Sequence, residues 1–310
     1  MRTLDAATTH DRLPMAPLIE ALRTMAIDGC VVPPRQVHTV SEGDAPGSLL
    51  SMVAWQPGRY LGIKMVTVFA ANGARGLPSL HAMYTLFDAS TGVPLAQLDG
   101  AALTARRTAA VSALAASYLA RIDATRLLVV GAGRVASLLP AAMSAVRPID
   151  RVAIWNHHPE RARELARELC EQGLRAEASD DLRVAVQAAH IVSCATLSTQ
   201  ALIGGDWLKG GTHLDLIGSF TPDMREADGR CVARSRVFVD QVEALQKAGD
   251  LLQAMAEGAF DRTRLQGTLE QLCRGQRTGR TDADELTLFK SVGSAWQDLA
   301  AAGLAMRPAL

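Results

Sequence analysis

Short apolar segments separated by proline and glycine characterise residues 1–120. The run Tyr60–Phe69 has the length and the β-branched content of a strand, and His81–Asp88 has the same character. Residues that favour helix formation predict a short helix over Ala16–Met25 and a long alanine-rich helix over Ala101–Leu119. We therefore expect a first unit that mixes strands and helices.

From about Asp123 the pattern changes to a repeated strand, glycine turn and helix. The apolar run Arg126–Val130 ends directly in a glycine turn, and an apolar helix is predicted from that turn to Val146. Val152–Trp155 predicts the next strand and Pro159–Glu171 the next helix, with proline in its first turn. Further strands are predicted at His190–Cys194, His213–Ile217 and Val237–Asp240. Alternation of this kind is typical of a doubly wound parallel sheet.

The length of 310 residues suits about two domains of roughly 150 residues each. A final helix, predicted over Asp284–Ala302, is expected to pack back on the first unit. Lys and Arg together number 32, as do Asp and Glu, so the net charge of zero offers no electrostatic attraction for nucleic acid or an acidic membrane surface. We expect neither as a partner.

No uncharged apolar run approaches the ~20 residues needed to span a bilayer, and the N-terminal segment lacks the apolar stretch of a signal peptide. The five cysteines are widely spaced and form neither a CxxC pair nor a zinc-ligand pattern. These features favour a cytoplasmic protein with reduced thiols. The sequence contains no HExxH, GxSxG or P-loop motif and no EF-hand loop, and we expect no metal site.

The turn after the first strand of the second unit carries a dinucleotide-binding pattern. The first glycine of such a turn permits the sharp bend, the second lets the backbone approach a pyrophosphate, and the third small residue lets the helix pack close to the sheet. Free N–H groups at the start of the helix favour an anion. The pattern G-x-G-x-x-G/A is matched by Gly131, Ala132, Gly133, Arg134, Val135 and Ala136. The strand and helix on either side favour a dinucleotide site over a purely structural turn.

The end of the second strand distinguishes NAD from NADP in such folds, because an acid there bonds the ribose 2′-hydroxyl and repels a 2′-phosphate. No acid follows Trp155 directly. Asn156 offers a hydrogen-bond donor, and His157, His158 and Arg161 offer positive charge for a phosphate. The sequence favours NADP(H) and leaves NAD(H) open, since two exposed histidines at the start of a helix would also explain this segment.

Basic residues of the first unit are candidates for binding an acidic small molecule. Arg35 follows two prolines, Lys64 lies among apolar residues of a predicted strand, and Arg107 lies in the alanine-rich helix. A lysine between apolar neighbours is unusual unless its face meets a ligand or solvent. The pattern alone is explained equally by an exposed strand position for Lys64 and by solvated arginines.

Four blocks of the sequence resemble the ornithine cyclodeaminase/mu-crystallin family, in family order and over nearly the whole chain. The blocks are Leu98–Gly100 with Leu103–Ala115, Gly131–Ala136, Ile217–Glu226 and Leu288–Gly293. The resemblance implies an α/β protein in which a Rossmann doubly wound parallel sheet is inserted into an α+β substrate-binding and dimerisation domain. It places the inserted dinucleotide-binding domain at residues 121–283 and the other domain at residues 1–120 plus 284–310.

The resemblance also implies roles for individual residues. Arg35 would clamp the substrate carboxylate, Lys64 would lie beside that carboxylate and the reacting nitrogen, and Arg107 would hold the carboxylate or a cofactor phosphate. Near the nicotinamide and its ribose it places Thr196, Ile217 and Ser291, and beside the substrate Val292 and Gly293. The implied partners are a small α-imino or α-amino acid and a second copy of the chain in a homodimer.

One position departs from the family's pattern. Ornithine cyclodeaminases carry an aspartate shortly after the glycine of the third block, where this sequence has Phe220; Asp223 follows later. Phenylalanine cannot transfer a proton or pair with an ammonium group, so the departure disfavours cyclodeaminase activity. The strand end Trp155–Asn156 resembles instead the mu-crystallin and ketimine-reductase branch of the family.

We therefore expect an NAD(P)H-dependent reductase of small cyclic ketimines, such as Δ1-pyrroline-2-carboxylate or Δ1-piperideine-2-carboxylate. Lys64 is the candidate for polarising or protonating the imine nitrogen, and the like charges of Arg35 and Arg107 are expected to lower its pKa. The alternatives are an ornithine cyclodeaminase, an alanine-dehydrogenase-like oxidoreductase, and a non-catalytic NADPH-binding protein of the crystallin type. Retention of all three basic residues argues against the last of these.

Overall fold

A computed structural model describes residues 1–40 and 47–307 and divides the chain into two compact units. The first unit comprises Met1–Arg107 and Ser294–Leu310, and the second comprises Thr108–Gly293. The second unit is thus inserted between two pieces of the first along the chain. Within the described ranges, no helix is both long and apolar enough to cross a membrane.

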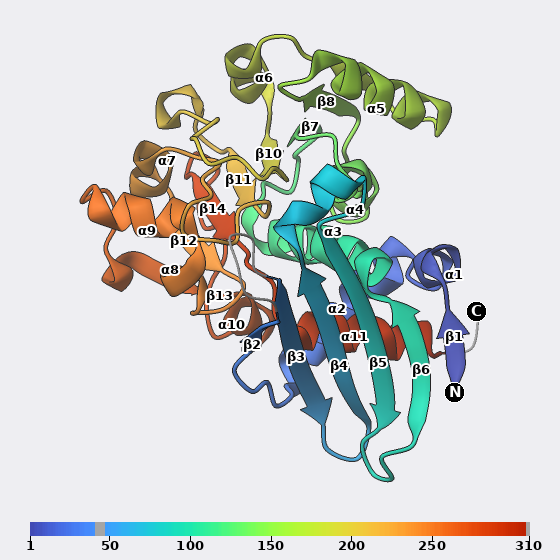
Figure 1. Cartoon of the computed structure of the whole chain (residues 1–310). Coiled ribbons are helices and arrows are strands. Elements are labelled where there is room, and N and C mark those ends of the chain that lie inside the picture. Colours follow the sequence, from blue (N-terminus) through green and yellow to red (C-terminus); the bar gives the residue numbers. More distant parts are fainter. Residues whose placement is uncertain (41–46, 308–310) are drawn as a thin grey trace. The chain divides into compact units, whose positions relative to one another are not determined.

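The first unit contains a six-stranded sheet in the order β1-β6-β5-β4-β3-β2 (Figure 1). Its strands are β1 (Arg2–Leu4), β2 (Gln36–Thr39), β3 (Ser48–Gln56), β4 (Tyr60–Val68), β5 (Leu80–Asp88) and β6 (Pro94–Asp99). Neighbouring strands pair antiparallel except for β1 and β6, which are parallel. The helices are α1 (Ala6–Asp11), α2 (Met15–Asp28), the 3-10 helix η1 (Ala70–Arg75) and α11 (Ala295–Ala305). This combination confirms the expected α+β character.

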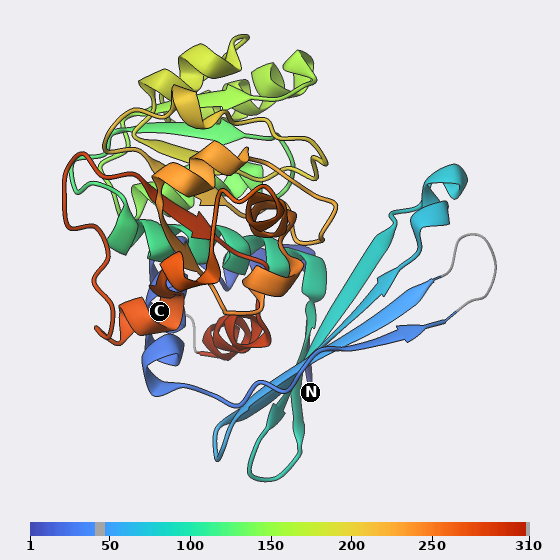
Figure 2. The ribbon, with the colours of Figure 1, turned by 90° about the vertical axis from the view of Figure 1, so that its left-hand side faces the viewer.

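Side chains of this sheet alternate between two faces. Lys64 and Tyr84 are paired across β4 and β5 and are buried on the inner face, whereas the paired Met65 and Met83 are exposed on the outer face. Helix α11 packs on β3, β4 and β5, and α2 packs against α11. In Figure 2 these helices lie on one side of the sheet, and none of the described α-helices of this unit lies on its outer face.

The second unit contains an eight-stranded, entirely parallel sheet in the order β9-β8-β7-β10-β11-β14-β12-β13. Its strands are β7 (Arg126–Val130), β8 (Arg151–Trp155), β9 (Ala176–Ala178), β10 (Ile191–Cys194), β11 (His213–Leu216), β12 (Arg236–Val239), β13 (Leu265–Thr268) and β14 (Thr287–Lys290). The strand order reverses between β7 and β10, which is where parallel folds of this type bind ligands. The predicted doubly wound parallel sheet is confirmed.

Helices connect these strands. They are α4 (Leu139–Ser144), α5 (Pro159–Glu171), α6 (Leu182–Ala188), α7 (Gly229–Arg234), α8 (Ala244–Lys247), α9 (Gly249–Ala256) and α10 (Leu269–Cys273), with the 3-10 helices η2 (Ala136–Leu138), η3 (Gly205–Trp207) and η4 (Arg262–Arg264). Helix α3 (Gly100–Leu119) contributes its residues up to Arg107 to the first unit and the rest to the second.

Two predicted helices differ from the structure. The helix expected to reach Val146 is a 3-10 turn followed by the short α4, which begins beside Pro140 and ends at Ser144. The helix expected over Asp284–Ala302 is wrong over its first part, because β14 occupies Thr287–Lys290 and pairs with β11 and β12. This strand assigns residues up to Gly293 to the second unit, ten residues beyond the predicted boundary at 283.

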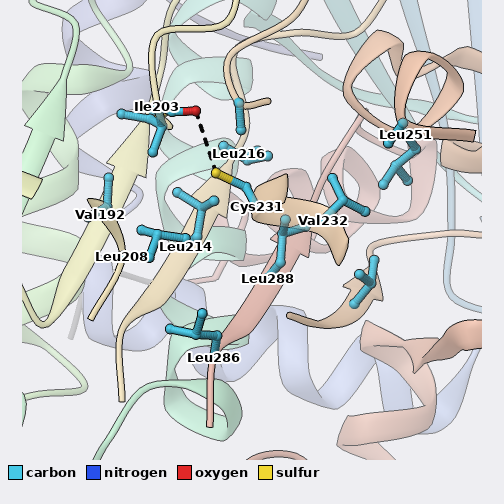
Figure 3. Close-up of a cluster of buried hydrophobic side chains, with 14 of the residues drawn as sticks. Val192, Ile203, Leu208, Leu214, Leu216, Cys231, Val232, Leu251, Leu286 and Leu288 are labelled. Atoms are coloured by element: carbon cyan, nitrogen blue, oxygen red, sulfur yellow. Dashed lines mark hydrogen bonds between the residues drawn. The ribbon is translucent and has the colours of Figure 1, made fainter. Parts of the chain in front are cut away.

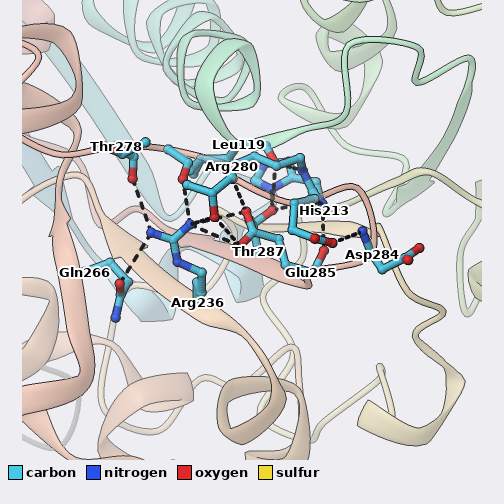
Figure 4. A network of polar contacts seen from close by, with 12 residues as sticks. Leu119, His213, Arg236, Gln266, Thr278, Arg280, Asp284, Glu285 and Thr287 are labelled. Carbon is cyan, nitrogen blue, oxygen red and sulfur yellow. Dashed lines mark hydrogen bonds and ion pairs between the residues drawn. The ribbon is translucent and has the colours of Figure 1, made fainter.

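The core of the second unit is a continuous apolar cluster that includes Leu214, Leu216 and Leu288 of β11 and β14 (Figure 3). A polar network closes the amino-terminal ends of these strands (Figure 4). In it Arg280 donates to the carbonyl of Leu119 at 2.7 Å and to Thr287 Oγ1 at 3.0 Å, and Nδ1 of buried His213 lies 3.0 Å from the same hydroxyl. Burial lowers the pKa of His213 to about 3, so this end of the sheet holds a neutral imidazole.

Candidate active site

A buried carboxylate joins two of the predicted basic residues of the first unit. Asp298 Oδ2 lies 2.7 Å from Lys64 Nζ, and Asp298 Oδ1 accepts a hydrogen bond of 2.9 Å from Arg107 Nε. None of the three side chains is more than 7% exposed. The inner face of β4, helix α3 and helix α11 each contribute one residue. We call Lys64, Arg107 and Asp298 the ion triad.

Local structure fixes the geometry of the ion triad. Helix α11 begins with a capping box between Ser294 and Gln297, which places Asp298 in the first turn, where the helix dipole favours a negative charge. Gln297 Oε1 accepts a second hydrogen bond from Arg107, at 2.8 Å. Thr104, one turn before Arg107 on α3, accepts a long hydrogen bond of 3.4 Å from Lys64. Both cations are therefore held by two partners each.

The charge of Arg35 also acts on this cluster. Arg35 lies in the irregular segment before β2, it is half-buried, and its Nε is buried without a hydrogen-bond partner among the described residues. Its positive charge lowers the pKa of Lys64. The structure thus brings together all three basic residues that the sequence singled out. Three cations against the single carboxylate of Asp298 leave an uncompensated positive charge.

The pKa of Lys64 lies near neutral pH, where its side chain can exchange a proton. Burial lowers its pKa from 10.5 to about 8; the charge of Asp298 opposes this, and the charges of Arg107 and Arg35 add to it. The predicted direction of the pKa shift is confirmed, but burial, rather than the neighbouring positive charges, is its largest cause. Burial also raises the pKa of Tyr84, whose buried hydroxyl has no hydrogen-bond partner among the described residues. A neutral phenol therefore lies on the same face as Lys64.

The glycine turn of the second unit has the shape of an anion-binding cradle. Gly131 adopts φ of 121°, which disfavours other residues, and a Cβ there would lie 2.7 Å from the carbonyl oxygen of Ala195. Around Gly133 no atom lies within 4 Å of the position that a Cβ would take. Among the described residues, no protein acceptor receives a hydrogen bond from the amides of Ala132, Gly133, Arg134 or Val135. The turn fits a pyrophosphate.

The segment after β8 carries no acid at its start. Asn156 Oδ1 accepts a hydrogen bond of 2.8 Å from the amide of His158, which fixes the turn into α5. The rings of His157 and His158 lie with their centroids 4.0 Å apart and their planes tilted by 46°, and His158 Nδ1 lies 3.5 Å from the exposed carboxylate of Glu160. Two imidazoles are thus grouped where the sequence predicted a 2′-phosphate.

Loops at the carboxyl ends of β10, β11 and β14 carry the remaining predicted residues. The amide of Ile217 donates to the carbonyl of Cys194 at 3.0 Å, which joins the ends of β11 and β10. Buried Asp240, directly after β12, accepts from Ser291 Oγ at 2.8 Å and from the amides of Val292 at 3.2 Å and Gly293 at 2.7 Å. Because parallel strands end at one edge of the sheet, these loops lie on the edge that carries the glycine turn.

A second carboxylate, Glu226, holds Thr196. Its Oε1 accepts from the amide of Thr196 at 2.7 Å and from the Thr196 hydroxyl at 2.9 Å. Phe220, at the place where cyclodeaminases carry an acid, is 44% exposed, and Asp223 is exposed as well. No group of three or more His, Cys, Asp or Glu side chains in the described ranges is arranged to hold a metal ion.

Three buried carboxylates that organise these groups were not predicted from the sequence: Asp298, Asp240 and Glu226. For two of them the sequence does contain an indication. Asp298 is the only charge in the apolar run Ala295–Ala305, and Asp240 directly follows the apolar strand β12. An acid in such a place is costly to bury without a partner, and it therefore indicates one. Glu226 lies in a polar segment and carries no such signal.

Comparison with known proteins places the chain in a family. Residues 6–307 match the ornithine cyclodeaminase/mu-crystallin family. The Δ1-pyrroline-2-carboxylate reductase of Paracoccus denitrificans is 42% identical over 292 residues, which cover 93% of this chain and 90% of that protein.

Two solved structures are similar throughout. The Δ1-pyrroline-2-carboxylate reductase of Thermococcus litoralis, in complex with NADH and L-proline, has a TM-score of 0.91 at 31% identity and covers 98% of this chain and 96% of its own. An archaeal alanine dehydrogenase dimer with bound NAD has a TM-score of 0.88 at 27% identity and covers 98% and 94%. The expected resemblance is confirmed: this chain belongs to the ornithine cyclodeaminase/mu-crystallin family.

Proposed function

We propose that this protein reduces small cyclic ketimines that carry a carboxylate next to the C=N bond, namely Δ1-pyrroline-2-carboxylate or Δ1-piperideine-2-carboxylate. The observation that carries the proposal is the buried excess of positive charge formed by Arg35, Lys64 and Arg107 around one carboxylate. A substrate carboxylate would neutralise it. The 42% identical reductase of Paracoccus supports this choice of substrate.

The basic residues would divide the work of binding and proton transfer. Arg35, whose buried Nε has no hydrogen-bond partner in the described part of the chain, can make a bidentate contact with the carboxylate. Arg107 is committed to Asp298 and Gln297 through two of its nitrogens and can offer its third. We also assign to substrate binding the backbone of Val292 and Gly293, which Asp240 holds in position.

The reaction needs one hydride and one proton. When bound, a reduced nicotinamide would supply the hydride to the C=N carbon, and the electron pair of the π bond would move to nitrogen. Lys64, with a pKa of about 8, carries the proton near neutral pH and can give it to that nitrogen directly or through water. Asp298 keeps the ammonium group in place at 2.7 Å. Lys64, Arg35 and Arg107 are therefore the proposed catalytic and substrate-binding residues.

The cofactor would lie along the carboxyl ends of the second unit's strands. We assign the pyrophosphate to Gly131, Ala132, Gly133, Arg134 and Val135, and the nicotinamide and its ribose to Thr196, Ile217 and Ser291. We assign the adenosine ribose to Asn156, His157 and His158. The absence of an acid directly after β8 and the two grouped imidazoles favour NADP(H), with NAD(H) accepted as well.

We also propose that the chain forms a homodimer through the outer face of the first unit's sheet. Beside the exposed Met65 and Met83, this face carries further half-buried apolar side chains: Val53, Trp55, Leu61, Ile63 and Phe87. A contiguous apolar face of this kind is typical of an interface. The dimer of the similar archaeal alanine dehydrogenase supports a second copy of the chain as its occupant.

The test is the loss of reduced-nicotinamide absorbance with purified protein, each ketimine, and NADPH or NADH. We expect oxidation with both ketimines, faster with NADPH. Lys64→Met should lower kcat by about 100-fold or more while leaving cofactor binding unchanged, because the proton donor is lost. No oxidation of either cofactor, or formation of ammonia from L-ornithine instead, would overturn the proposal. Near-normal turnover by Lys64→Met would remove the role of that residue alone.

A further inference from the structure

A second buried charge cluster lies in the second unit, apart from the ion triad. It consists of Lys290 at the end of β14, Asp250 on α9 and Glu226 in the loop before α7, and all three side chains are 0% exposed. Lys290 Nζ lies 2.8 Å from Asp250 and 3.9 Å from Glu226, and it donates to Ser219 Oγ at 2.5 Å. We call Lys290, Asp250 and Glu226 the loop anchor.

Glu226 binds two loops at once. Through Oε1 it accepts the amide and hydroxyl of Thr196, in the loop after β10, and through Oε2 it accepts the amides of Gly218 at 3.0 Å and Ser219 at 3.2 Å, in the loop after β11. Strands β10 and β11 are adjacent and parallel. Four donors on one carboxylate therefore set the spacing of two neighbouring loops at the edge of the sheet where ligands bind.

The approach of these loops is as close as the backbone permits. A Cβ at position 218 would collide with the backbone of Thr196 and with the carboxylate of Glu226. Asp250 in turn fixes Glu226, because its Oδ1 accepts the amides of Glu226 at 2.7 Å and Ala227 at 3.0 Å. Few adjustments of one loop are possible without moving the other, since four hydrogen bonds from the two loops meet on the same carboxylate.

We propose that Glu226 is a positioning residue for cofactor binding: its carboxylate holds the loops after β10 and β11 in the arrangement that receives the nicotinamide. This inference rests on the proposed function, because Thr196 and Ile217 are there assigned to the nicotinamide. Glu226 is buried and faces the backbone, so it acts through these loops.

The hydrogen bonds that attach the loops after β10 and β11 to Glu226 depend on the negative charge of its carboxylate. Burial raises the pKa of Glu226 to about 7; Lys290 opposes this rise and Asp250 adds to it. Cys194 of β10 also lies close, but burial raises its pKa well above the usual value, so it remains a neutral thiol. A proton on Glu226 converts an acceptor into a donor opposite backbone N–H groups, which also donate. We therefore expect the loops to loosen, and cofactor affinity to fall, as the pH decreases through about 7.

The first test is NADH and NADPH affinity, measured by the fluorescence of the bound nicotinamide from about pH 6 to about pH 9. In the wild type the Kd should rise below about pH 7. Glu226→Gln should raise the Kd by about tenfold at high pH and abolish this pH dependence, because its amide group faces donors that need an acceptor. The matched control is Glu257→Gln, which removes a partly exposed ion pair with Arg225 and should change neither quantity.

The second test needs no variant and no cofactor. Hydrogen exchange of the wild-type peptide that contains Gly218 and Ser219, corrected for the intrinsic rate, should become faster at about pH 6 than at about pH 8, while the sheet core remains protected. Equal corrected rates at both pH values would overturn the loop attachment even if Glu226→Gln fails to fold.

The two proposals fail in different ways. A wild type that binds no nicotinamide cofactor at any pH contradicts the proposed function. A wild type that binds it, together with a folded Glu226→Gln that has the same Kd and the same pH dependence, contradicts only the role of Glu226.

Discussion

At the scale of single residues, the charge of Asp298 determines the pH at which Lys64 loses its proton. Lys64 is buried beside the positive charges of Arg107 and Arg35, and only Asp298 opposes their effect on its pKa. The protonated form is the proposed donor, so turnover should fall as the pH rises through the pKa of Lys64, about 8. We expect Asp298→Asn to move this alkaline limb of kcat/KM to lower pH by about one unit or more.

The control for this prediction is Asp28→Asn, which removes an exposed ion pair of 3.5 Å with Arg59 in the same unit. It should leave the pH profile unchanged, since exposed pairs contribute little. Asp298→Asn should also destabilise the fold, because it leaves two buried cations without their anion. A folded Asp298→Asn with the wild-type alkaline limb would show that Asp298 has only a structural role.

The same residues illustrate what a sequence can indicate about a site. Arg107 was identified because it lies in a family block, Lys64 because a lysine among the apolar residues of a strand is unusual, and Arg35 because it follows two prolines in a region that resembles the family. Asp298 lies 191 positions after Arg107, and only the packing of α11 on the sheet brings it to hydrogen-bond distance. Local sequence patterns do not predict a contact between residues so far apart in the chain. An isolated acid in an apolar helix is the one local sign of it.

At the scale of elements, the two glycines of the glycine turn have different roles: Gly131 allows the backbone conformation of the turn, and Gly133 leaves room for the pyrophosphate. Gly131 needs its positive φ and lies against Ala195, so Gly131→Ala should destabilise the protein, by about 1–3 kcal/mol, and weaken cofactor binding. Gly133 has open space around it, so Gly133→Ala should leave the melting temperature unchanged. It should still raise the Kd for NADPH, because the second glycine admits the pyrophosphate to the backbone.

Thermal unfolding and cofactor titration of both variants check this prediction. Gly92→Ala provides a control for positive φ alone, because Gly92 has φ of 73° in an exposed turn and open space around it. It should cost stability without changing cofactor affinity. Unchanged affinity in Gly133→Ala would contradict a pyrophosphate at this turn.

The sequence predicted helices and strands correctly where short local patterns define them. It failed for a strand that is defined by pairing with distant parts of the chain. The bounds of β7 and α5 agree with the sequence, because an apolar run ended by glycine and a helix begun by proline are local signals. Strand β14 was taken for the start of a helix, since its four residues lie only a short loop before the apolar run of α11. Its place between β11 and β12 depends on contacts with strands about 50 to 75 residues away along the chain, which no short window records.

At the scale of the whole molecule, the insertion of one unit into the other explains the order of the site residues along the chain. The two terminal pieces build the cluster of Lys64, Arg107 and Asp298, and the inserted piece builds the glycine turn and the loop anchor. Each unit thus contains one buried charge cluster of its own. The two-part organisation was predictable from the family blocks. Its first limit lies within α3, after Arg107 rather than after residue 120 as predicted, and its second limit follows β14, after Gly293.

The outer face of the first unit's sheet gives the last prediction. Met65 and Met83 form a cross-strand pair, 41% and 44% exposed, among half-buried apolar neighbours. A lysine at the centre of such a face would have to be buried without a partner if two copies met there, which is strongly unfavourable. Met65→Lys should therefore convert a dimer into a monomer, as measured by light scattering. Ile122→Lys is the matched control, because Ile122 is 86% exposed in the second unit and should leave the dimer intact. A wild type that is monomeric at micromolar concentration, or a Met65→Lys variant that remains dimeric, would contradict this interface.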